Sequence, residues 1–199
     1  MGVAALIAFV AFALLDWRAV AEGRKNLEYV AKPGALAALI VYASAGDDPS
    51  PWLIAALCLG LLGDIYLMLP VDLFAAGLGA FLVGHLAYIG EFDAPWGWTL
   101  LWFVFIAGGT FPVSGRIIGA VKDGGQRVAV IAYFGVITLM AGAAFASGLT
   151  TAALGAVLFV ASDAILAWDR FVQPLSWGRM AVIITYHLAQ FALASALRG

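Results

Sequence analysis

Eight apolar runs make up most of the chain, and short polar connections separate them. Inside a bilayer each backbone polar group needs a partner within its own segment, and a helix needs about 17–25 mostly apolar residues to cross. The chain is 64% hydrophobic and 11% charged, which excludes an ordinary soluble domain. We therefore predict an all-α fold, a polytopic membrane helix bundle of about eight transmembrane helices that forms one integral domain over residues 1–199. The apolar runs that predict these helices are 2–15, 29–44, 52–69, 73–90, 96–113, 128–146, 151–167 and 180–197.

The first two runs and the single cysteine indicate further features of the fold. The first run has no basic stretch before it and is followed by Asp16 rather than a cleavage site, so it predicts a transmembrane helix and not a removable signal peptide. The second run is short and opens with Lys32-Pro33, and because proline suits the first helical turn we expect the helix to begin there. The single Cys58 excludes an internal disulfide and a cysteine-based metal site.

The basic residues predict how the bundle is oriented. Positively charged loops favour the cytoplasmic side of the membrane. The basic residues lie in or beside the first, fifth and seventh connections, so we expect these three connections in the cytoplasm. With eight spans, both termini are then outside. We expect an integral protein of a bacterial inner (plasma) membrane. The basic residues in or beside the first, fifth and seventh connections are Arg18, Arg24, Lys25, Lys32, Arg116, Lys122, Arg127, Arg170 and Arg179.

Two aspartates interrupt apolar runs, Asp64 in the third and Asp163 in the seventh. A charge at membrane depth is costly, so an ionisable residue there is a candidate for function. Both lie about five residues, roughly 7 Å, before the cytoplasmic end of the expected helix, so we expect them to share a depth. Their carboxyl groups are then expected within roughly 10 Å of each other, as in two-carboxylate hydrolases.

In such a pair, one carboxyl group would act as the acid and the other as the base. Two carboxylates in a low-dielectric site cannot both ionise cheaply, so one keeps its proton while the other stays charged. Two other readings remain open for Asp64 and Asp163. They could cap neighbouring helices or bond small residues such as Ser162, or they could relay protons in a transporter.

A short internal similarity also relates the two halves of the chain. The run after Asp64 contains His85-Leu86-Ala87, and the run after Asp163 contains His187-Leu188-Ala189. Four helices in each half would make a 4+4 repeat, in which equivalent residues meet near the repeat interface.

Several aromatic and polar residues could line a substrate cavity near the aspartates. In the fourth run His85 and Tyr88 share a helix face with Gly77 and Phe81. In the last run Tyr186 and Gln190 share a face, with His187 beside them, and Tyr133 lies near the start of the sixth run. Each of these residues could equally serve in packing or interfacial anchoring.

Lys32 is the basic residue that could enter the membrane layer. Its ammonium could bind a phosphate, offset a carboxylate, or reach back to the surface. A zinc site from the two histidines and the aspartates lacks a recognisable spacing, so we expect no metal and no organic cofactor. The chain has no glycine-rich phosphate loop, no GxSxG motif and no basic nucleic-acid surface, which argues against a nucleic-acid partner.

Over nearly its whole length the sequence resembles the YhhN family, membrane proteins that include animal lysoplasmalogenases. Where that family's pattern would have a leucine after Lys32-Pro33, this chain has Gly34. The resemblance rests on the order and spacing of short motifs: Lys32-Pro33, Gly63-Asp64 with Leu67-Met68, the series Gly77, Phe81, His85 and Tyr88, Tyr133, Phe159 with Ser162-Asp163 and Leu166-Ala167, and Tyr186 with Gln190.

The resemblance implies hydrolysis of the vinyl ether bond of lysoplasmalogens to a fatty aldehyde and a glycerophospho-alcohol. It implies Asp64 and Asp163 as catalytic residues and a lysophospholipid or ether lipid as substrate, and it leaves the oligomeric state open. The alternative is a proton-coupled transporter or a lipid-binding membrane protein that uses the same two aspartates. The residues expected to bind substrate are Lys32, His85, Tyr88, Tyr133, Tyr186, His187 and Gln190.

Overall fold

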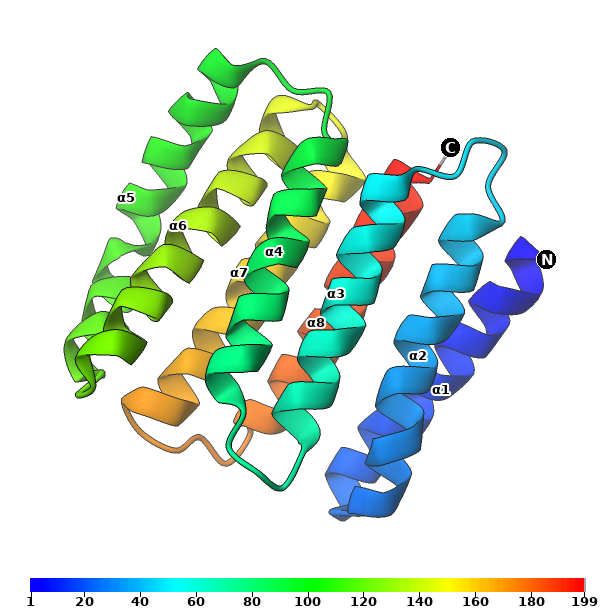
Figure 1. Cartoon of the computed structure of the whole chain (residues 1–199), viewed down its shortest axis with the longest axis horizontal. Coiled ribbons are helices and arrows are strands. Elements are labelled where there is room, and N and C mark those ends of the chain that lie inside the picture. The colour runs from blue at the N-terminus through cyan, green and yellow to red at the C-terminus, as the bar shows by residue number, and fades with distance from the viewer. Residues whose placement is uncertain (199) are drawn as a thin grey trace. The chain divides into compact units, whose positions relative to one another are not determined.

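The computed structural model describes residues 1–198, which form eight α-helices and no strand (Figure 1). The predicted all-α fold is therefore confirmed. Seven of these helices are long and apolar enough to cross a membrane. The remaining helix, α2, carries Lys25, Glu28 and Lys32 in its first half. The chain is an integral membrane protein. The helices are α1 (Gly2–Glu22), α2 (Lys25–Ser44), α3 (Pro51–Met68), α4 (Phe74–Glu91), α5 (Trp96–Ala120), α6 (Gly124–Ala146), α7 (Thr150–Phe171) and α8 (Gly178–Leu197).

Several helices extend past the apolar runs that predicted them. The first run predicted a helix ending at residue 15, but α1 continues to Glu22 and ends where Gly23 takes the left-handed conformation, with φ of 66°. Glycine adopts this conformation without a Cβ penalty and closes the last turn. Hydropathy marks the part of a helix suited to lipid, whereas the cap marks its end.

The expectation that α2 begins at Pro33 is wrong. The helix starts at Lys25, and Pro33 lies inside it. Proline lacks the N–H that would bond the carbonyl of Tyr29, so it removes one helical hydrogen bond, while the turns on either side keep theirs. Lys32 is therefore held on a formed helix and does not belong to a flexible connection.

The chain divides into two compact units at the connection between α4 and α5. The first unit comprises Met1–Glu91 and the last turn of α8 from Ala194, and the second comprises Phe92–Leu193. This boundary is where the expected 4+4 repeat would divide the chain. The repeat itself, and the single integral domain over residues 1–199, stay predictions.

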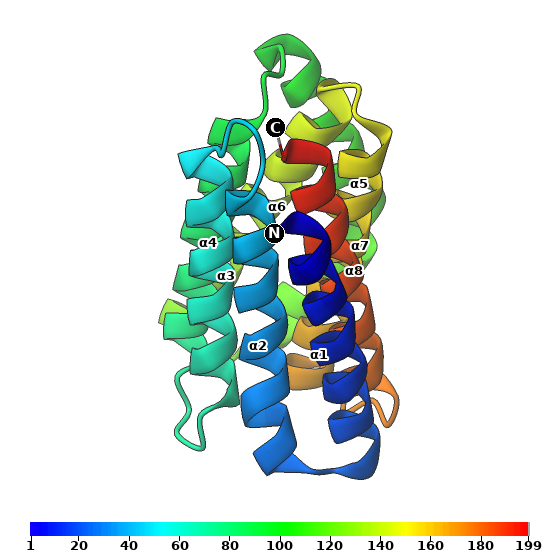
Figure 2. The ribbon, with the colours of Figure 1, turned by 90° about the vertical axis from the view of Figure 1, so that its right-hand side faces the viewer.

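In the first unit, α1 packs on α2, α2 on α3, and α3 on α4. The α1–α2 and α3–α4 connections lie at the same end of this unit in Figure 1, and Figure 2 shows α1 and α2 side by side. Glycines allow the helices to approach closely. A Cβ on Gly34 would lie 2.7 Å from the Phe12 ring, and one on Gly77 would lie 2.8 Å from Leu67. The Phe12 ring therefore occupies the space beside Gly34.

Side chains join the helices of the first unit at the end opposite the α1–α2 and α3–α4 connections. Ser50 caps α3 by accepting hydrogen bonds from the N–H groups of Trp52 at 3.2 Å and Leu53 at 3.4 Å, and its hydroxyl donates to Glu91 at the end of α4. Arg198 donates to the carbonyl of Ala45 at 2.7 Å after α2. These contacts satisfy backbone groups that every helix end leaves unpaired.

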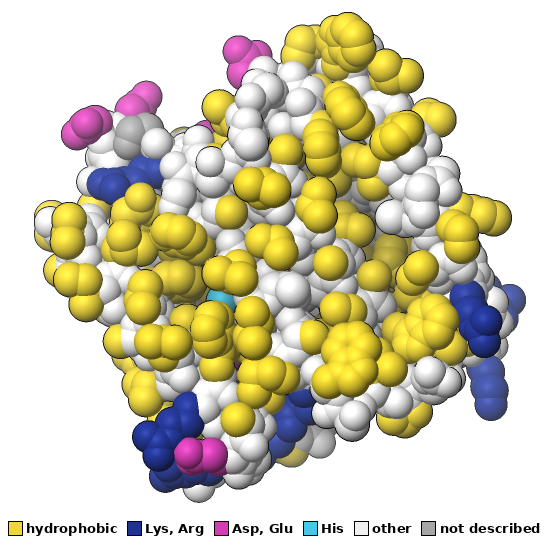
Figure 3. Space-filling model, turned by 180° about the vertical axis from the view of Figure 1, so that it is seen from behind, with side chains coloured by type: hydrophobic (Ala, Val, Ile, Leu, Met, Phe, Trp, Pro, Cys, Tyr) yellow, Lys and Arg dark blue, Asp and Glu magenta, His cyan; other side chains and the backbone are white. Residues whose placement is uncertain are grey.

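In the second unit, α5 packs on α6 and α7, and α6 packs on α7. A Cβ on Gly142 of α6 would lie 2.7 Å from the Thr99 carbonyl of α5, so these two backbones nearly touch. Thr99 and Ile117 are the buried residues of α5, and most of its large apolar side chains are exposed. Figure 3 shows hydrophobic side chains over most of one face of the molecule, as expected where lipid replaces water.

Gly63 offers a sharp test of the packing around Asp64. A Cβ on Gly63 would lie 2.6 Å from the Phe81 ring, whereas one on Gly79 would meet no atom within 4 Å. We expect Gly63→Ala to lower the free energy of unfolding by about 1–3 kcal/mol through overpacking. Gly79→Ala is the matched control and should be neutral or stabilising, since alanine is the better helix former. Reversible unfolding in detergent measures both variants, and a Gly63→Ala protein as stable as Gly79→Ala would contradict the close α3–α4 contact.

Candidate active site

The first half of the candidate site centres on an ion pair between α2 and α3. Lys32 Nζ lies 2.9 Å from Asp64 Oδ1, with the carboxylate side chain 1% exposed and the lysine side chain 13% exposed. Asp64 lies on the buried face of α3 with Gly60 and Gly63, two residues that leave room for neighbouring helices. A buried carboxylate requires a partner of this kind, because its desolvation is otherwise too costly. Of the three readings of Lys32, the structure shows the one in which it offsets a carboxylate.

The buried face of α4 completes this half. Gly77, Phe81, His85 and Tyr88 are all buried, as expected for one helix face packed inside the unit. Phe81 meets α3 at Gly63, next to Asp64, and His85 follows one turn later on the same face. The two predicted substrate-binding residues of α4 therefore lie on the face that packs against the helix of Asp64.

The second half of the site centres on a hydrogen bond between α6 and α7. The Tyr133 hydroxyl donates to Asp163 Oδ2. Tyr133 is buried, with 5% of its surface exposed, whereas Asp163 is only partly buried. This pairing brings together two residues that lie in separate runs and that the sequence had placed in one layer only by their positions along the helices.

Residues of α8 contact Phe159, which lies one turn before Asp163 on α7. The Phe159 ring packs edge-on against the Tyr186 ring, with centroids 5.5 Å apart, and the Gln190 amide donates to the Tyr186 hydroxyl at 3.1 Å. The His187 ring lies beside Tyr186 at 5.9 Å. Gln190 and His187 are 1% exposed, so the predicted face of α8 is a buried one.

Ser162 fixes α7 against α8, because its hydroxyl donates to the Val182 carbonyl at 3.1 Å. A Cβ on Gly155 would also lie 3.1 Å from the Ala189 carbonyl, so the two helices are in close contact over several turns. The Ser162 hydroxyl, which one of the alternative readings paired with an aspartate, thus makes a bond between helices.

The two aspartates belong to different units, Asp64 to the first and Asp163 to the second. Their shared depth was predicted by counting about five residues back from a helix end, and that count is wrong for Asp163. Asp64 lies four residues before the end of α3, but Asp163 lies eight before the end of α7, because that helix continues for one more turn to Phe171. Helix ends are thus not a common reference for depth.

One buried carboxyl group was missed by the sequence reasoning. Asp16 was taken as the polar stop after the first run, yet it lies inside α1 and is fully buried. Its spacing from Phe9 and Ala13, at seven and three residues, places it on the buried face of the helix and was the signal that could have found it.

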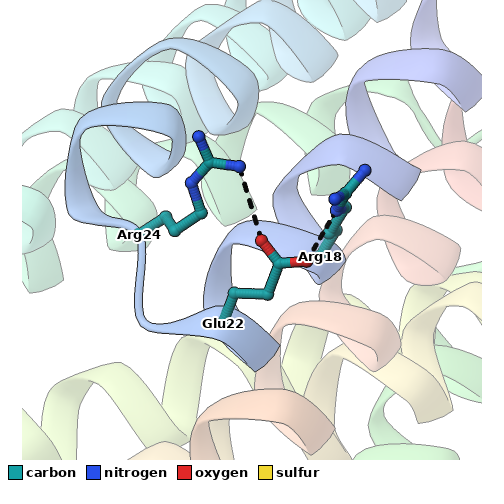
Figure 4. A network of polar contacts seen from close by, with 3 residues as sticks. All are labelled: Arg18, Glu22 and Arg24. Carbon is teal, nitrogen blue, oxygen red and sulfur yellow. Dashed lines mark hydrogen bonds and ion pairs between the residues drawn. The ribbon is translucent and has the colours of Figure 1, made fainter.

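A solvated charge cluster marks the turn between α1 and α2 (Figure 4). Arg18 Nε lies 2.7 Å from Glu22 Oε1, and Arg24 lies 3.4 Å from the other oxygen of the same carboxylate. All three side chains are at least 40% exposed, so these pairs contribute little to stability. They belong to the basic set on which the predicted orientation rests.

Within residues 1–198, no group of three or more His, Cys, Asp or Glu side chains is placed to hold a metal ion. Among the residues that the sequence singled out, Lys32 pairs with Asp64, Tyr133 bonds to Asp163, and Gln190 bonds to Tyr186.

The model of the YhhN family matches residues 27–197, a range that contains every residue of both halves of the site. The chain belongs to the YhhN family. Among its relatives are proteins named lysoplasmalogenase TMEM86B. The Mus musculus protein is 35% identical over 164 residues, which cover 81% of this chain and 70% of the relative. The Homo sapiens protein is 34% identical over 147 residues, covering 72% of this chain and 62% of the relative.

The chain thus spans about two thirds of the length of these relatives. The Sus scrofa protein of the same name is 34% identical over 75% of this chain. No solved structure matches the chain.

Proposed function

We propose that this chain hydrolyses the vinyl ether bond of a lysoplasmalogen-type ether lysolipid, releasing a fatty aldehyde and a glycerophospho-alcohol. The observation that carries the proposal is the similarity to the lysoplasmalogenases, which covers 81% of this chain in the mouse comparison. The site adds chemical support, since each half holds a carboxyl group with a specific partner inside an apolar helix bundle.

The chemistry suits two carboxyl groups in different protonation states. Proton transfer to the β-carbon of the vinyl ether gives an oxocarbenium ion, and water then adds to give a hemiacetal that collapses to the aldehyde and the alcohol. A neutral carboxyl group supplies the proton and a carboxylate stabilises the cation, as in glycoside hydrolysis.

The substrate is proposed to be a single-chain amphiphile with a phosphate head group. Its alkenyl chain would lie along apolar helices, which expose many large hydrophobic side chains. Its head group would stay at the end of the helices where basic residues such as Arg18 and Arg24 lie. With the positive-inside rule, that end faces the cytoplasm of a bacterial cell and both termini lie outside.

A panel of three lysolipids tests the proposal with purified protein. They share head group and chain length but carry the chain through a vinyl ether, a saturated alkyl ether or an ester. We expect aldehyde from the vinyl ether alone. The alkyl ether and the ester have no C=C bond beside the oxygen, so no proton can add at carbon to give the oxocarbenium ion. In D₂O, the aldehyde, trapped at once by reduction, should carry one deuterium on the carbon next to the carbonyl.

Two outcomes would contradict the proposal. Release of fatty acid from the ester without aldehyde would indicate a different hydrolase. The second is proton movement in proteoliposomes, driven by a solute gradient and without turnover of any lipid in the panel. It would favour the transporter that uses the same two aspartates.

A further inference from the structure

We propose that Arg116 binds the phosphate of the lysolipid head group while the vinyl ether lies beside Asp163. This inference rests on the proposed function, and it uses Asp163 without assigning it the role of acid or of base. Arg116 is then a specificity-determining residue, which selects lysolipids that carry a phosphate over neutral ether lipids with the same chain.

Arg116 is held by an aromatic ring and not by a carboxylate. It is exposed, four residues before the end of α5, and its guanidinium carbon lies 5.5 Å from the centre of the Trp168 ring on α7. Such a cation–π contact orients a guanidinium without neutralising it. Within residues 1–198 Arg116 forms no ion pair, and the carboxylate that follows Trp168, Asp169, accepts instead from the N–H of Leu175 at 2.6 Å. The charge of Arg116 is therefore available to a ligand.

The basic residues of the first unit are less suited to a phosphate, because they already contact carboxylates. Arg18 and Arg24 share the carboxylate of Glu22, at 2.7 and 3.4 Å. Lys32, for which the sequence left a phosphate-binding role open, lies 2.9 Å from Asp64, and its side chain is only 13% exposed. A cation paired in this way offers an incoming phosphate less net charge.

The separation between Arg116 and Asp163 fits the substrate. Trp168, which carries the guanidinium over its ring, follows Asp163 by five residues on α7, about 7 Å along the helix. In a lysoplasmalogen, six bonds separate the phosphorus from the vinyl ether carbon that is attached to oxygen. An extended chain of this length spans about 7 Å. A phosphate beside the guanidinium therefore leaves the vinyl ether at the level of Asp163 along the helix.

The contacts between α5 and α6 support the same depth. Arg127, near the start of α6, donates to the carbonyl of Val121 just after α5 at 2.6 Å, which joins these two helix ends (Figure 1). Arg116 lies five residues before Val121, and Tyr133, which bonds to Asp163, lies six residues after Arg127. These offsets are about 7 and 9 Å along the helices, so the backbone of Arg116 lies near the depth of Tyr133. Its long side chain then carries the guanidinium toward the end of the helices.

The chemistry of the two groups is complementary. A guanidinium stays protonated and presents its donors in a planar fork, which matches two oxygens of a phosphate. The phosphodiester of a phosphocholine or phosphoethanolamine head group carries the same negative charge, whichever amine it bears. Arg116 is therefore expected to select for the phosphate and not for the amine.

Two vinyl ether substrates with the same chain test this role. One carries a phosphocholine head group, the other is the 1-alkenylglycerol that lacks the phosphate, and both are presented in micelles of a neutral detergent. We expect Arg116→Met to raise KM for the phosphocholine substrate about 10–100-fold with little change in kcat, because the contact is lost equally from the bound substrate and the transition state. The same variant should hydrolyse the alkenylglycerol as the wild type does.

Three further variants separate a phosphate contact from a general effect of charge. Lys122→Met is the matched control, because it removes the same charge from an exposed residue six positions after Arg116, and it should leave both KM values unchanged. Arg116→Lys keeps the charge without the planar fork and should recover part of the affinity. Trp168→Leu removes the ring that orients the guanidinium and should raise KM for the phosphocholine substrate about 3–10-fold.

Binding of saturated alkyl ether analogues gives a readout that does not depend on turnover. In calorimetric titrations in the same micelles, Arg116→Met should raise Kd for the phosphocholine analogue about 10–100-fold and leave Kd for the alkylglycerol unchanged. If the wild type binds with this selectivity but releases no aldehyde from either vinyl ether, the proposed function fails while the phosphate site stands.

Three outcomes overturn the phosphate site. Arg116→Met could weaken both substrates alike, which would indicate an effect on the fold. Lys122→Met could raise KM as much as Arg116→Met does, which would indicate attraction by the charge of the whole surface. Arg116→Met could also leave KM and Kd for the phosphocholine lipids unchanged. Normal aldehyde release by the wild type in any of these cases would leave the proposed function standing.

Discussion

Asp64→Asn and Asp163→Asn should each lower kcat for aldehyde release by about 10²–10⁴-fold, the contribution that a positioned acid or base makes to a reaction. The amide keeps the volume of the carboxyl group but neither gives up a proton in this range nor carries a charge. Initial rates of aldehyde formation from a vinyl ether lysolipid, measured at matched protein concentrations, provide the comparison. Asp48→Asn is the control, because Asp48 is exposed in the connection between α2 and α3.

Folding has to be separated from chemistry in the Asp64 variant. Its amide leaves the Lys32 ammonium facing a neutral partner in a buried position. The double variant Lys32→Met/Asp64→Asn removes both charges, and we expect it to be folded and still inactive. Normal turnover by either single asparagine variant would remove that residue from the mechanism.

The second large effect is on stability. Lys32→Met should lower the free energy of unfolding by about 3–5 kcal/mol near neutral pH, because it leaves the buried carboxylate of Asp64 without compensation. The cost should shrink as the pH falls, since Asp64 can then take up a proton and become neutral. Reversible unfolding in detergent, followed at several pH values, measures both effects.

A double-variant cycle shows whether the pair acts as a unit. The Lys32→Met/Asp64→Asn protein should be more stable than either single variant, so that the two effects are strongly non-additive. Arg18→Met is the matched control: it breaks an ion pair of 2.7 Å whose side chains are 64% and 40% exposed. That change should cost less than about 1 kcal/mol. Additive effects at Lys32 and Asp64 would contradict the buried ion pair.

The sequence determined the helices and the faces that they bury. Each expected helix has a counterpart in the structure, because lipid leaves a backbone no other way to satisfy its hydrogen bonds. The helical period also selected buried residues correctly: His85 and Tyr88 on α4, and Tyr186 and Gln190 on α8, are all inside the fold.

The ends of the helices were harder to predict from the sequence. The apolar runs stop at the first charged residues, but α1 and α7 continue beyond them until a cap or a turn ends the hydrogen-bond ladder. For the same reason Asp16 was read as lying outside a helix whose buried face it shares. Hydropathy reports the preference for lipid, and that preference ends before the helix does.

Only the tertiary structure decided which partner each aspartate has. The sequence indicated Lys32, Asp64 and Tyr133 as candidates, but the contact of a given pair depends on the rotation and axial register of two helices. Those are set by close approaches at glycines, such as Gly34 beneath Phe12 and Gly63 beneath Phe81, which depend on side chains from separate helices. The sequence therefore named the members of the site, while packing paired Lys32 with Asp64 and Tyr133 with Asp163.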